Sequence, residues 1–495
     1  MRIINSGIQE NLKEIVLFSF DNIMIPLQHG LRLQLNPYCH SVDNKSNIVM
    51  GLGEPGTPDD RVVTLYGTVR KVGEELWMWY CGGSSFDDNW HERICLAKSS
   101  DGRLWEKPNL GLFEFNGNRN NNLVSFPIKE HVQALVVFYE PEELDPSRRF
   151  KMSFQTKKYK SGMGIAFSHD GLSWELFSDH ALTPFLEQSG GTKFNGVYYI
   201  NGQGGKHWSA NDNFSRKLVT HMSYDFIDWT EAASLGFRRD SISPAPTNYG
   251  SNSGKQVHLG AALWNRGNTV LGFYGKWNGH PSQDRRLTWM DLGLIISHDC
   301  LHFYEPIPDF PIVQASETNW YPIGSEGPRF LKDRPGGDSI VYYPAIIQGQ
   351  GFENIGNETL FWYAPWPEGD ADGIRLATWP RDRLGFLSPY VGPDEDSFMI
   401  SQPLSLGGKS ARVYLNIDGI GELAHVKVEV LNERFEPITG YSAKEHTDNL
   451  DPGFRQHVLW SGLDSVSSDI PIRIRINFKG VRPEDIRLYA IYLEQ

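Results

Sequence analysis

Acidic residues stand at or just before the start of an expected β-strand at four widely separated places in the chain. They are Asp59 with Asp60, then Glu130, Glu187 and Glu326. A carboxyl group gives up a proton in one step of a reaction and takes one up in another, so two carboxyls that meet form an acid–base pair. The chemistry open to these residues therefore depends on whether the fold brings the starts of distant strands together.

Two polar loops mix charged groups with imidazole and indole side chains. They span 84–93 and 204–208. Such mixtures suit a ligand that has both an apolar face and hydroxyl groups, because rings stack on the one and charged groups bond to the other. Exposed loops are polar in most proteins, which is the competing interpretation. The binding residues predicted from these loops are Asp88, His91, Arg93, His207 and Trp208.

A fivefold repeat indicates the elements that would position these residues. Each copy contains an Asp followed four positions later by an aromatic residue, and an apolar run precedes it. An Asp-Gly turn between apolar runs is a hairpin signal, and repeats at this spacing indicate units that pack side by side. We expect the Trp that ends each of the first three copies to be buried between neighbouring units. The copies are Ser99–Trp105, Ser168–Trp174, Ser223–Trp229, Ser297–Phe303 and the degenerate Pro380–Phe386.

Each repeat also contains apolar runs upstream of its turn. Examples are Val62–Tyr66 and Leu76–Tyr80 before the first turn, and Val270–Tyr274 before the fourth. Their β-branched and aromatic residues are typical of buried strands. With a last strand after each turn, every unit has four strands, as a β-propeller blade does. The predicted fold is therefore all-β, with a five-bladed propeller over residues 45–392.

The last hundred residues have a different hydrophobic pattern, in which apolar and polar residues alternate. Alternation is typical of strands with one face on a core and one in water. We predict a β-sandwich over residues 397–495, and a segment 1–44 that packs on the propeller or closes it. The sandwich would brace the propeller or bind carbohydrate, and bracing is the favoured interpretation. The alternating runs are Ala411–Ile417, Val426–Leu431, Ile472–Phe478 and Arg487–Leu493.

The net charge excludes two classes of partner. A formal charge of −13 argues against nucleic acid and anionic membranes, both of which need a basic surface. No run of apolar residues is long enough to span a membrane, and the first residues lack the apolar core of a signal peptide. A cytoplasmic location is therefore expected. The oligomeric state stays open.

Metal and cofactor signals are absent from the sequence. Cys39, Cys81, Cys95 and Cys300 lack the spacing of a zinc site and the density of a disulfide scaffold, so we expect buried free thiols. The 15 histidines include no pair at metal-ligand spacing. The Gly-rich run Gly202–Gly205 is interpreted as part of a loop between strands, because it lacks the strand-to-helix context of a phosphate-binding loop. Neither a metal nor another cofactor is predicted.

A propeller followed by a sandwich resembles the clan of glycoside hydrolases that includes families 32, 43, 62 and 68, with the related family 130 phosphorylases. The runs Leu96–Gly117, Asp145–Met152 and Leu17–Ile25 resemble a broad group of family-32-like or family-43-like proteins. The likeness covers nearly the whole chain, but the matching motifs are mostly structural turns. It implies a glycoside hydrolase that is exo-acting on an oligosaccharide, furanoside or pyranoside. Some members of the clan hold calcium or another ion on the propeller axis, and this sequence leaves that point open.

The resemblance also implies roles for the acids. Glycoside cleavage needs two carboxyl groups across the scissile bond. The clan supplies an Asp from the first blade, an Asp from the second that orients and tunes, and a Glu general acid from the third. On this pattern Asp60 is the nucleophile or base. Glu187 is the general acid, with Phe185 and Leu186 as an apolar wall that favours its protonated form.

The second and fifth blades are less regular. The second offers Glu130 or His131 in place of the clan's Asp, because Asp145 reads as part of a turn. Glu326 opens the first strand of the fifth blade among small residues that would let a ligand approach. If these acids do not carry the reaction, the remaining candidates are Asp43, Asp88, Glu92 and Glu358.

Two other function classes stay open. A glycoside phosphorylase would need a basic phosphate site, for which the available clusters are Arg238–Arg239 and Arg285–Arg286. The third class is a non-catalytic glycan-binding or scaffold propeller, because a fold does not fix a function.

Overall fold

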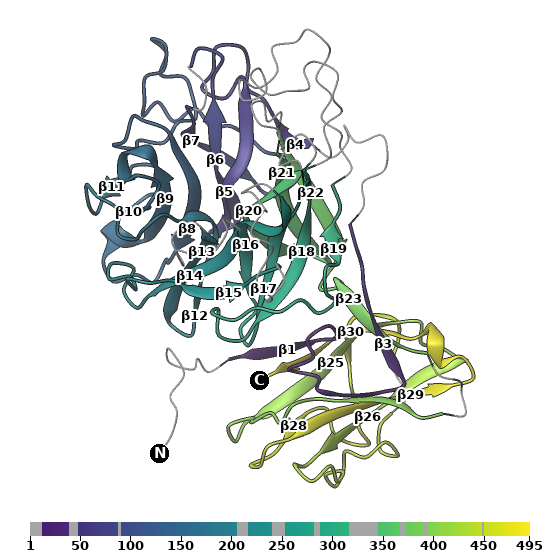
Figure 1. Cartoon of the computed structure of the whole chain (residues 1–495). Helices are drawn as coiled ribbons and strands as arrows, with labels where there is room; N and C mark the ends of the chain where they lie inside the picture. The colour runs from purple at the N-terminus through teal and green to yellow at the C-terminus, as the bar shows by residue number, and fades with distance from the viewer. Residues whose placement is uncertain are drawn as a thin grey trace.

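The computed structural model contains two groups of β-sheets. It describes residues 12–38, 48–87, 91–204, 216–239, 253–281, 288–315, 345–366, 373–390, 392, 395–447 and 450–495. Across these ranges the regular elements are β-strands and short 3-10 helices, with no α-helix. Four sheets stand together in the upper part of Figure 1, and two further sheets lie below them. One of the four has seven strands and is described below as two antiparallel sheets joined by a single parallel pair, so that five sheets are numbered. The prediction of an all-β chain is confirmed.

The five upper sheets, numbered here as sheets 1 to 5, follow one another along the chain. Sheet 1 contains β5 (Val62–Val72), β6 (Glu75–Gly83) and β7 (Arg93–Ser99). Sheet 2 contains β8 (Val132–Tyr139), β9 (Phe150–Thr156), β10 (Met163–Ser168) and β11 (Glu175–Leu176). Sheet 3 contains β12 (Glu187–Phe194), β13 (Val197–Gly204), β14 (Lys217–Ser223) and β15 (Ser234–Phe237). Sheet 4 contains β16 (Gly254–Asn265), β17 (Val270–Gly279), β18 (Trp289–Ser297) and β19 (Pro311–Val313). Sheet 5 contains β20 (Ile346–Ile355), β21 (Glu358–Pro365), β22 (Gly373–Pro380) and β4 (Ile48–Gly51).

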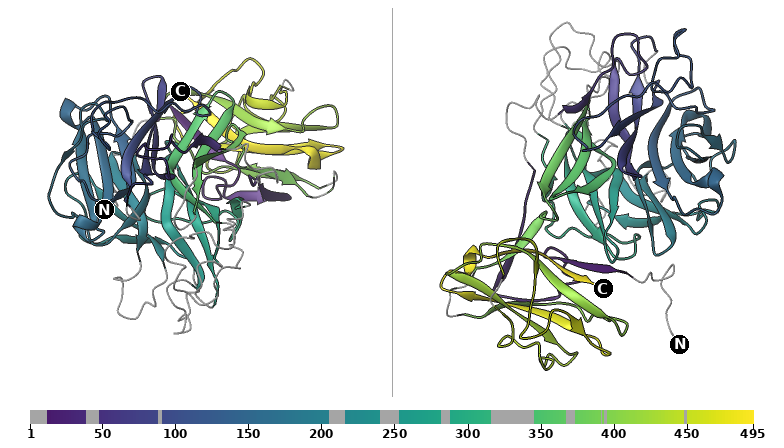
Figure 2. Two further views of the ribbon diagram at one scale, coloured as in Figure 1. Left: turned by 90° about the horizontal axis from the view of Figure 1, so that it is seen from above. Right: turned by 180° about the vertical axis from the view of Figure 1, so that it is seen from behind.

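The first strands of the five sheets contact one another in a closed cycle. β5 contacts β8, β8 contacts β12, β12 contacts β16, β16 contacts β20, and β20 returns to β5. A single parallel pair, Gln350 with Thr68, joins sheet 5 to sheet 1. Figure 2 shows these sheets side by side from two further directions. Strands far apart in the sequence therefore meet at the centre of one ring.

Every first strand of the ring carries a β-bulge. A bulge redirects side chains, and polar side chains near these bulges bond to the backbone of the neighbouring sheet. Gln188 Nε2 donates to the Ala134 carbonyl at 2.7 Å, and Gln350 Nε2 donates to the Leu263 carbonyl at 2.5 Å. Hydrogen-bonded amides thus fill part of the ring's centre. The bulges lie between Thr64 and Thr68, Gln133 and Val136, Gln188 and Gly190, His258 and Ala261, and Gln348 and Phe352.

The repeated Asp turns are structural. In the first turn, Asp101 Oδ1 accepts the backbone N–H groups of Arg103 at 2.8 Å and Leu104 at 2.9 Å. Asp170, Asp225 and Asp299 make the same pair of bonds two and three residues downstream. The residue after each of these Asp has a positive φ, which Gly102 and Gly171 adopt at little cost. The sequence motif therefore specifies a turn and no chemistry.

The strand that follows the fifth copy of the motif does not join sheet 5. The prediction that the four strands of this sheet follow one another along the chain is therefore wrong. After Asp382 the chain leaves the ring as β23 (Gly385–Pro389), which pairs with β3 (Leu31–Leu35) and β30 (Arg487–Glu494). The outer strand of sheet 5 is instead β4, which pairs with β22. A strand from the start of the chain thus completes the last sheet.

Two antiparallel sheets share an apolar core at the other end of the molecule. The larger contains β27 (Gly453–His457), β25 (Ser410–Asp418), β30, β23 and β3, joined at its edges by β1 (Glu14–Phe18) and β28 (Val466–Ser467). The smaller contains β2 (Leu27–His29), β24 (Ser397–Ile400), β29 (Arg473–Gly480) and β26 (Ala424–Leu431). The alternating runs expected near the C-terminus all form strands here. The N-terminal strands β1, β2 and β3 pair within these two sheets. Val16 of β1 also contacts the ring, because its backbone exchanges two hydrogen bonds of 2.9 Å with the Asn268 side chain.

Buried polar groups join the two parts of the molecule. Asp382, 1% exposed, accepts hydrogen bonds from Arg266 of the ring and, at 2.8 Å, from Tyr492 of β30. Asp21, which is fully buried, receives the Tyr304 hydroxyl at 2.9 Å and pairs with His298 at 3.1 Å. An apolar cluster that includes Phe18, Phe273 and Tyr492 surrounds these contacts. The junction is therefore a continuous core.

Candidate functional site

Glu187 is the predicted acid whose carboxyl group is held by side chains of neighbouring strands. It is the partly buried first residue of β12, opposite Gln203 of β13. The Tyr66 hydroxyl of β5 donates to its Oε1 at 2.9 Å, and the Gln203 amide donates to its Oε2. Gln203 Oε1 accepts the Leu259 N–H of sheet 4 at 3.1 Å, which fixes the amide's orientation. Groups from three sheets thus orient one carboxyl group.

The bulges explain why Tyr66 reaches Glu187. Tyr66 lies in the part of β5 skipped by the register shift between Thr64 and Thr68, so its ring turns away from the ordinary alternation. β5 and β12 start at the same end of the ring because both are first strands of their sheets. Tyr66 is 8% exposed, so the hydroxyl is presented from a packed position.

Glu92, directly before β7, is a second carboxyl beside Tyr66. It is 7% exposed, and burial raises its pKa to about 7, against the hydrogen bond with Cys81 and the positive charge of Arg61. Burial also raises the pKa of Tyr66, as do the negative charges of Glu187 and Glu92. Near neutral pH Glu92 therefore exists in both protonation states, which is the property a proton donor needs.

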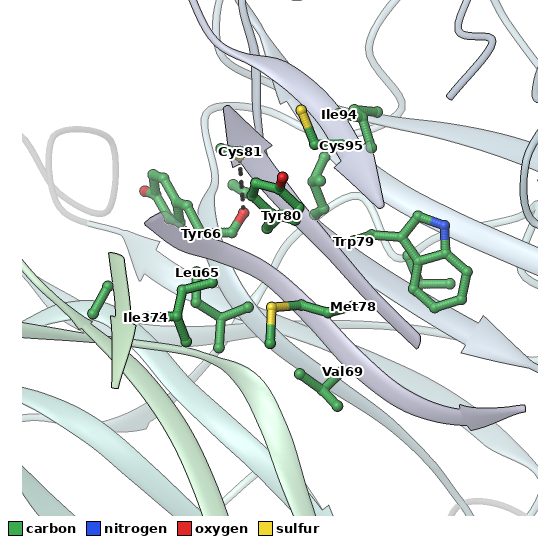
Figure 3. Packing of buried hydrophobic residues seen from close by; sticks show 14 of the residues in the cluster. Leu65, Tyr66, Val69, Met78, Trp79, Tyr80, Cys81, Ile94, Cys95 and Ile374 are labelled. Atoms are coloured by element: carbon green, nitrogen blue, oxygen red, sulfur yellow. Dashed lines mark hydrogen bonds between the residues drawn. The ribbon is translucent and has the colours of Figure 1, made fainter. Parts of the chain in front are cut away.

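Figure 3 shows how the side chains of sheet 1 support this region. Tyr66, Cys81 and Tyr80 lie together, with a hydrogen bond of 3.4 Å from Cys81 Sγ to the Tyr66 carbonyl. Cys81, Cys95 and Cys300 are buried free thiols, as expected. Burial is the first cause that raises the pKa of Cys81 well above its usual value. The thiol is thus a packed neutral support for Tyr66 and Glu92.

His131 is held as a neutral imidazole. Its Nδ1 accepts the Glu92 N–H at 3.2 Å, so Nε2 carries the hydrogen and donates to Gln133 Oε1 at 2.9 Å. Gln133 Nε2 continues the chain to Gln155 at 2.7 Å. Burial lowers the pKa of His131 to about 4. Both ring nitrogens are occupied, so this histidine positions the Glu92 backbone.

Asp60, the predicted nucleophile or base, joins two turns. It accepts the Gly56 N–H at 2.8 Å, the Ser85 N–H at 2.6 Å and the Ser84 hydroxyl at 3.1 Å. Burial raises its pKa, but these hydrogen bonds outweigh burial and the net pKa lies below the usual value. Over the described residues, no hydrogen bond links Asp60 to Glu187. Its catalytic role stays a prediction.

The remaining predicted residues of sheet 1 and sheet 2 contact other groups. Arg93 forms a bidentate salt bridge with Asp87, with N–O distances of 2.5 and 2.7 Å. Glu130 is exposed, and its charge acts on His91. Burial is the first cause that lowers the pKa of His91. Arg93 is therefore a loop-fixing residue, while Glu130 and His91 lie close to one another.

Five of the candidate catalytic and binding residues fall outside the described part of the chain. They are Asp43, Asp88, His207, Trp208 and Glu326. Conversely, sequence reasoning missed Tyr66, which reads as an ordinary strand aromatic, and Gln203, which lies in a Gly-rich run assigned to a loop. That run is in fact the end of β13. Glu92 was only a reserve candidate because its burial depends on neighbours distant in sequence.

No group of three or more His, Cys, Asp or Glu within the described ranges could hold a metal ion. No helix among the same residues is long and apolar enough to cross a membrane.

Comparisons with known proteins return distant likenesses of fold. No protein-family model matches the chain, and no curated protein matches it. The structure is similar to that of a glycosyl hydrolase from Bacteroides ovatus, with a TM-score of 0.44, 12% identity, and coverage of 71% of this chain and 95% of that one. It is also similar to a β-1,2-mannobiose phosphorylase from Listeria innocua, with a TM-score of 0.43, 12% identity, and coverage of 71% and 98%.

Proposed function

We propose that this protein is a glycoside hydrolase that is exo-acting on an oligosaccharide, with Glu187 as its general acid. The observation that carries the proposal is the Glu187 carboxyl, oriented by Tyr66 and Gln203 at the start of a first strand of the ring. A carboxyl at such a place can protonate the oxygen of a glycosidic bond. The nearby Glu92, with a pKa of about 7, supports acid–base chemistry at neutral pH.

The proposal includes the architecture. The ring of sheets 1 to 5 corresponds to a five-bladed β-propeller that runs from β4 to β22. The two sheets built from β1–β3 and β23–β30 correspond to a β-sandwich that braces it. The closed cycle of first strands and the shared core around Asp382 support this division.

The proposed reaction is hydrolysis of one carbon–oxygen bond. Glu187 gives its proton to the leaving sugar oxygen as the bond to the anomeric carbon breaks. Water adds its oxygen to that carbon, directly or after a carboxylate has held it, and the other proton of the water passes to a base. Asp60 stays the predicted base or nucleophile, and Glu326 stays a predicted catalytic residue without an assigned role. The separation of the two carboxyls would decide between retention and inversion.

Exo-action is supported by the way the ring's centre is filled. Four residues beyond Tyr66 on β5, Arg70 Nε donates to the Val137 carbonyl at 2.9 Å, and its Nη2 donates to the Gly191 carbonyl at 3.4 Å. Gln350 Oε1 accepts the Gly191 N–H at 3.1 Å. These bonds bridge the sheets beneath Glu187. A sugar chain that reached Glu187 along the axis would therefore end there.

The phosphorylase alternative needs cations that are available to phosphate. Arg239, in one of the two predicted clusters, donates to the Gln256 and Trp277 carbonyls, to Asn278 and to Asp309, at 2.6 to 3.0 Å. These contacts occupy its guanidinium, which favours hydrolysis. The second cluster, Arg285–Arg286, lies outside the described residues.

The test is a screen of the purified protein against furanosides and pyranosides, with and without phosphate. We expect sugar release without phosphate, and its loss by about 100-fold or more in Glu187→Gln, because removing a general acid forfeits about 10²–10⁴-fold. Glu175→Gln, at an exposed position of β11, is the matched control. Full turnover by Glu187→Gln would overturn the proposal. Release that depends on phosphate would favour the phosphorylase, and binding without turnover would favour a glycan-binding protein.

A further inference from the structure

Phe185 lies two residues before Glu187 and has an exposed ring. The backbone is extended at this place, because Phe185 forms an antiparallel bridge with Gly162 and β12 follows directly. The Leu186 N–H also donates to the Ser161 carbonyl at 3.2 Å. Side chains alternate along an extended chain. Leu186 is fully buried in an apolar cluster, whereas Phe185 is 38% exposed. Phe185 and Glu187 therefore point to the same side of the chain, away from that cluster.

The neighbouring chain leaves the Phe185 ring uncovered on one side. Its cross-strand neighbour is Gly162, which has no side chain to place against the ring. A larger residue does not fit there, because a Cβ added to Gly162 would lie 2.5 Å from the Thr183 carbonyl oxygen. Phe185 also belongs to none of the apolar clusters formed by the described residues. The ring is therefore available to a ligand that approaches Glu187.

The position of this ring, more than its exposure, indicates a role. Single exposed apolar residues are common on protein surfaces and need no explanation. Two residues of extended chain, however, span about 6.5 Å, which is comparable with the size of one sugar ring. The C–H face of a sugar stacks on an aromatic ring, and its hydroxyl groups bond to polar side chains. A sugar that lies on Phe185 therefore brings its glycosidic oxygen within reach of the Glu187 carboxyl.

We propose that the Phe185 ring binds the leaving sugar of the substrate by stacking, so that the substrates are glycans in which the leaving group is itself a sugar ring with a free C–H face. A general acid protonates the oxygen of the leaving group, and the sugar that carries this oxygen is the one beside Glu187. The stacking contact exists before and during bond cleavage, so its loss should raise KM more than it lowers kcat. The inference rests on the proposed role of Glu187.

The first test measures binding without turnover, in the whole protein with Glu187→Gln. The probes are cellobiose, maltose, lactose and arabinobiose, each beside the methyl glycoside of its non-reducing sugar, and NMR titration gives the dissociation constants. We expect Phe185→Ala to weaken binding of a disaccharide by about 3–10-fold, as for the loss of an aromatic stacking contact. Binding of the methyl glycoside, which lacks the leaving sugar, should not change. Phe177→Ala, 41% exposed after the outer strand of sheet 2, is the matched control.

The second test compares two leaving groups on the sugar that the screen shows to be released. An oligosaccharide loses a sugar, whereas a glycosyl fluoride loses fluoride, which has no ring to stack. Phe185→Ala should raise KM for the oligosaccharide by about 3–10-fold and change the kinetics on the fluoride little. Phe185→Trp should keep the wild-type KM because it has a flat ring. Phe185→Leu should behave as Phe185→Ala does, because leucine is apolar but has no flat face.

The outcomes separate the stacking role from the proposed function. Disaccharide affinity that is unchanged in Phe185→Ala, equal losses on the two leaving groups, or no binding of any probe overturns the stacking role. Full affinity in Phe185→Leu overturns it as well, and this variant decides if Phe185→Ala does not fold. Weakened disaccharide binding in Phe185→Ala, in a protein that turns over no glycan, would support the stacking role and contradict the proposed hydrolase.

Discussion

At the scale of single residues, the site depends on neutral donors that hold a carboxyl in place. Tyr66 and Gln203 each give one hydrogen bond to Glu187, and Gln203 is itself fixed by the Leu259 backbone. Neither donor can be exchanged for water without losing orientation, because Tyr66 comes from a packed strand. Positioning of this kind is a large part of what an enzyme contributes to a reaction.

Tyr66→Phe tests this positioning. The substitution keeps the ring in its packed place and removes the hydroxyl that donates to Glu187. We expect kcat/KM to fall by about 2–10-fold, since a hydrogen bond contributes about 0.5–1.5 kcal/mol. The thermal unfolding temperature should change little. An unaltered kcat/KM would show that the tyrosine hydroxyl has no part in the reaction.

The sequence predicted only part of this site. Glu187 was predicted because it precedes the expected first strand of the third blade and follows the apolar pair Phe185 and Leu186, which are local signals. Tyr66 was missed since its orientation comes from a bulge, and a bulge is decided by pairing with β6. The raised pKa of Glu92 comes from burial beneath residues of other strands, which no local pattern reports. The role of Asp60 stays a prediction, and that of Glu326 lies outside the described residues.

At the scale of elements, the first two Asp turns are each bound by a tryptophan of their own repeat and by one of the preceding sheet. Trp174 Nε1 donates to the Gly171 carbonyl at 3.2 Å, and Trp79 of sheet 1 donates to the same oxygen at 2.8 Å. The Gly102 carbonyl likewise receives Trp105 at 3.1 Å and Trp362 of sheet 5 at 2.8 Å. The turn of one sheet thus becomes part of the contact with its neighbour.

Trp174→Ala should therefore destabilise the protein more than Trp105→Ala. Trp174 is 3% exposed, and its loss leaves a cavity that costs about 3–5 kcal/mol. Trp105 is only partly buried, so its truncation should cost less. Urea unfolding of both variants checks the order, with Leu144→Ala, 96% exposed, as a control near zero. Equal costs for all three would contradict the structural role of these turns.

Fold prediction succeeded where the signal was local. The strands around Leu76–Tyr80 and Val270–Tyr274 formed where composition placed them. The failures concern pairing: β4 completes sheet 5, and β23 leaves for the other sheets. Such pairings join positions hundreds of residues apart, and their choice depends on which apolar faces remain uncovered once the ring forms.

At the scale of the whole molecule, the two parts share a core that contains buried charge. Arg266 of the ring is a buried cation whose partner is Asp382, and Tyr492 from the last strand binds the same carboxylate. Removing one member of a buried pair leaves the other charge unpaired, which is costly. Such contacts are made only when ring and sandwich-like sheets meet correctly. The junction should therefore unfold together with the parts that it joins.

The pair between Asp21 and His298 makes this junction sensitive to pH. Burial lowers the pKa of His298, but the hydrogen bond and negative charge of Asp21 outweigh burial, so the net pKa lies above the usual value. A raised pKa in the folded state means that the stabilisation is complete below the unfolded value of about 6.5 and is lost as the pH rises through the folded value. The pair should therefore contribute more to the free energy of unfolding in mild acid than in mild alkali.

His298→Gln measures that contribution. At about pH 5.5 the substitution should lower the free energy of unfolding by about 1.5–3 kcal/mol, because it removes a charged hydrogen bond to a fully buried carboxylate. At about pH 9 the cost should be smaller, since the wild-type histidine is then neutral. His302→Gln is the matched control: it lies on the same turn and pairs with Asp299, but its side chain is 75% exposed, so the cost should be small at either pH. A His298→Gln cost that is the same at both pH values, or larger in alkali, would show that the Asp21 contact does not depend on the imidazolium charge.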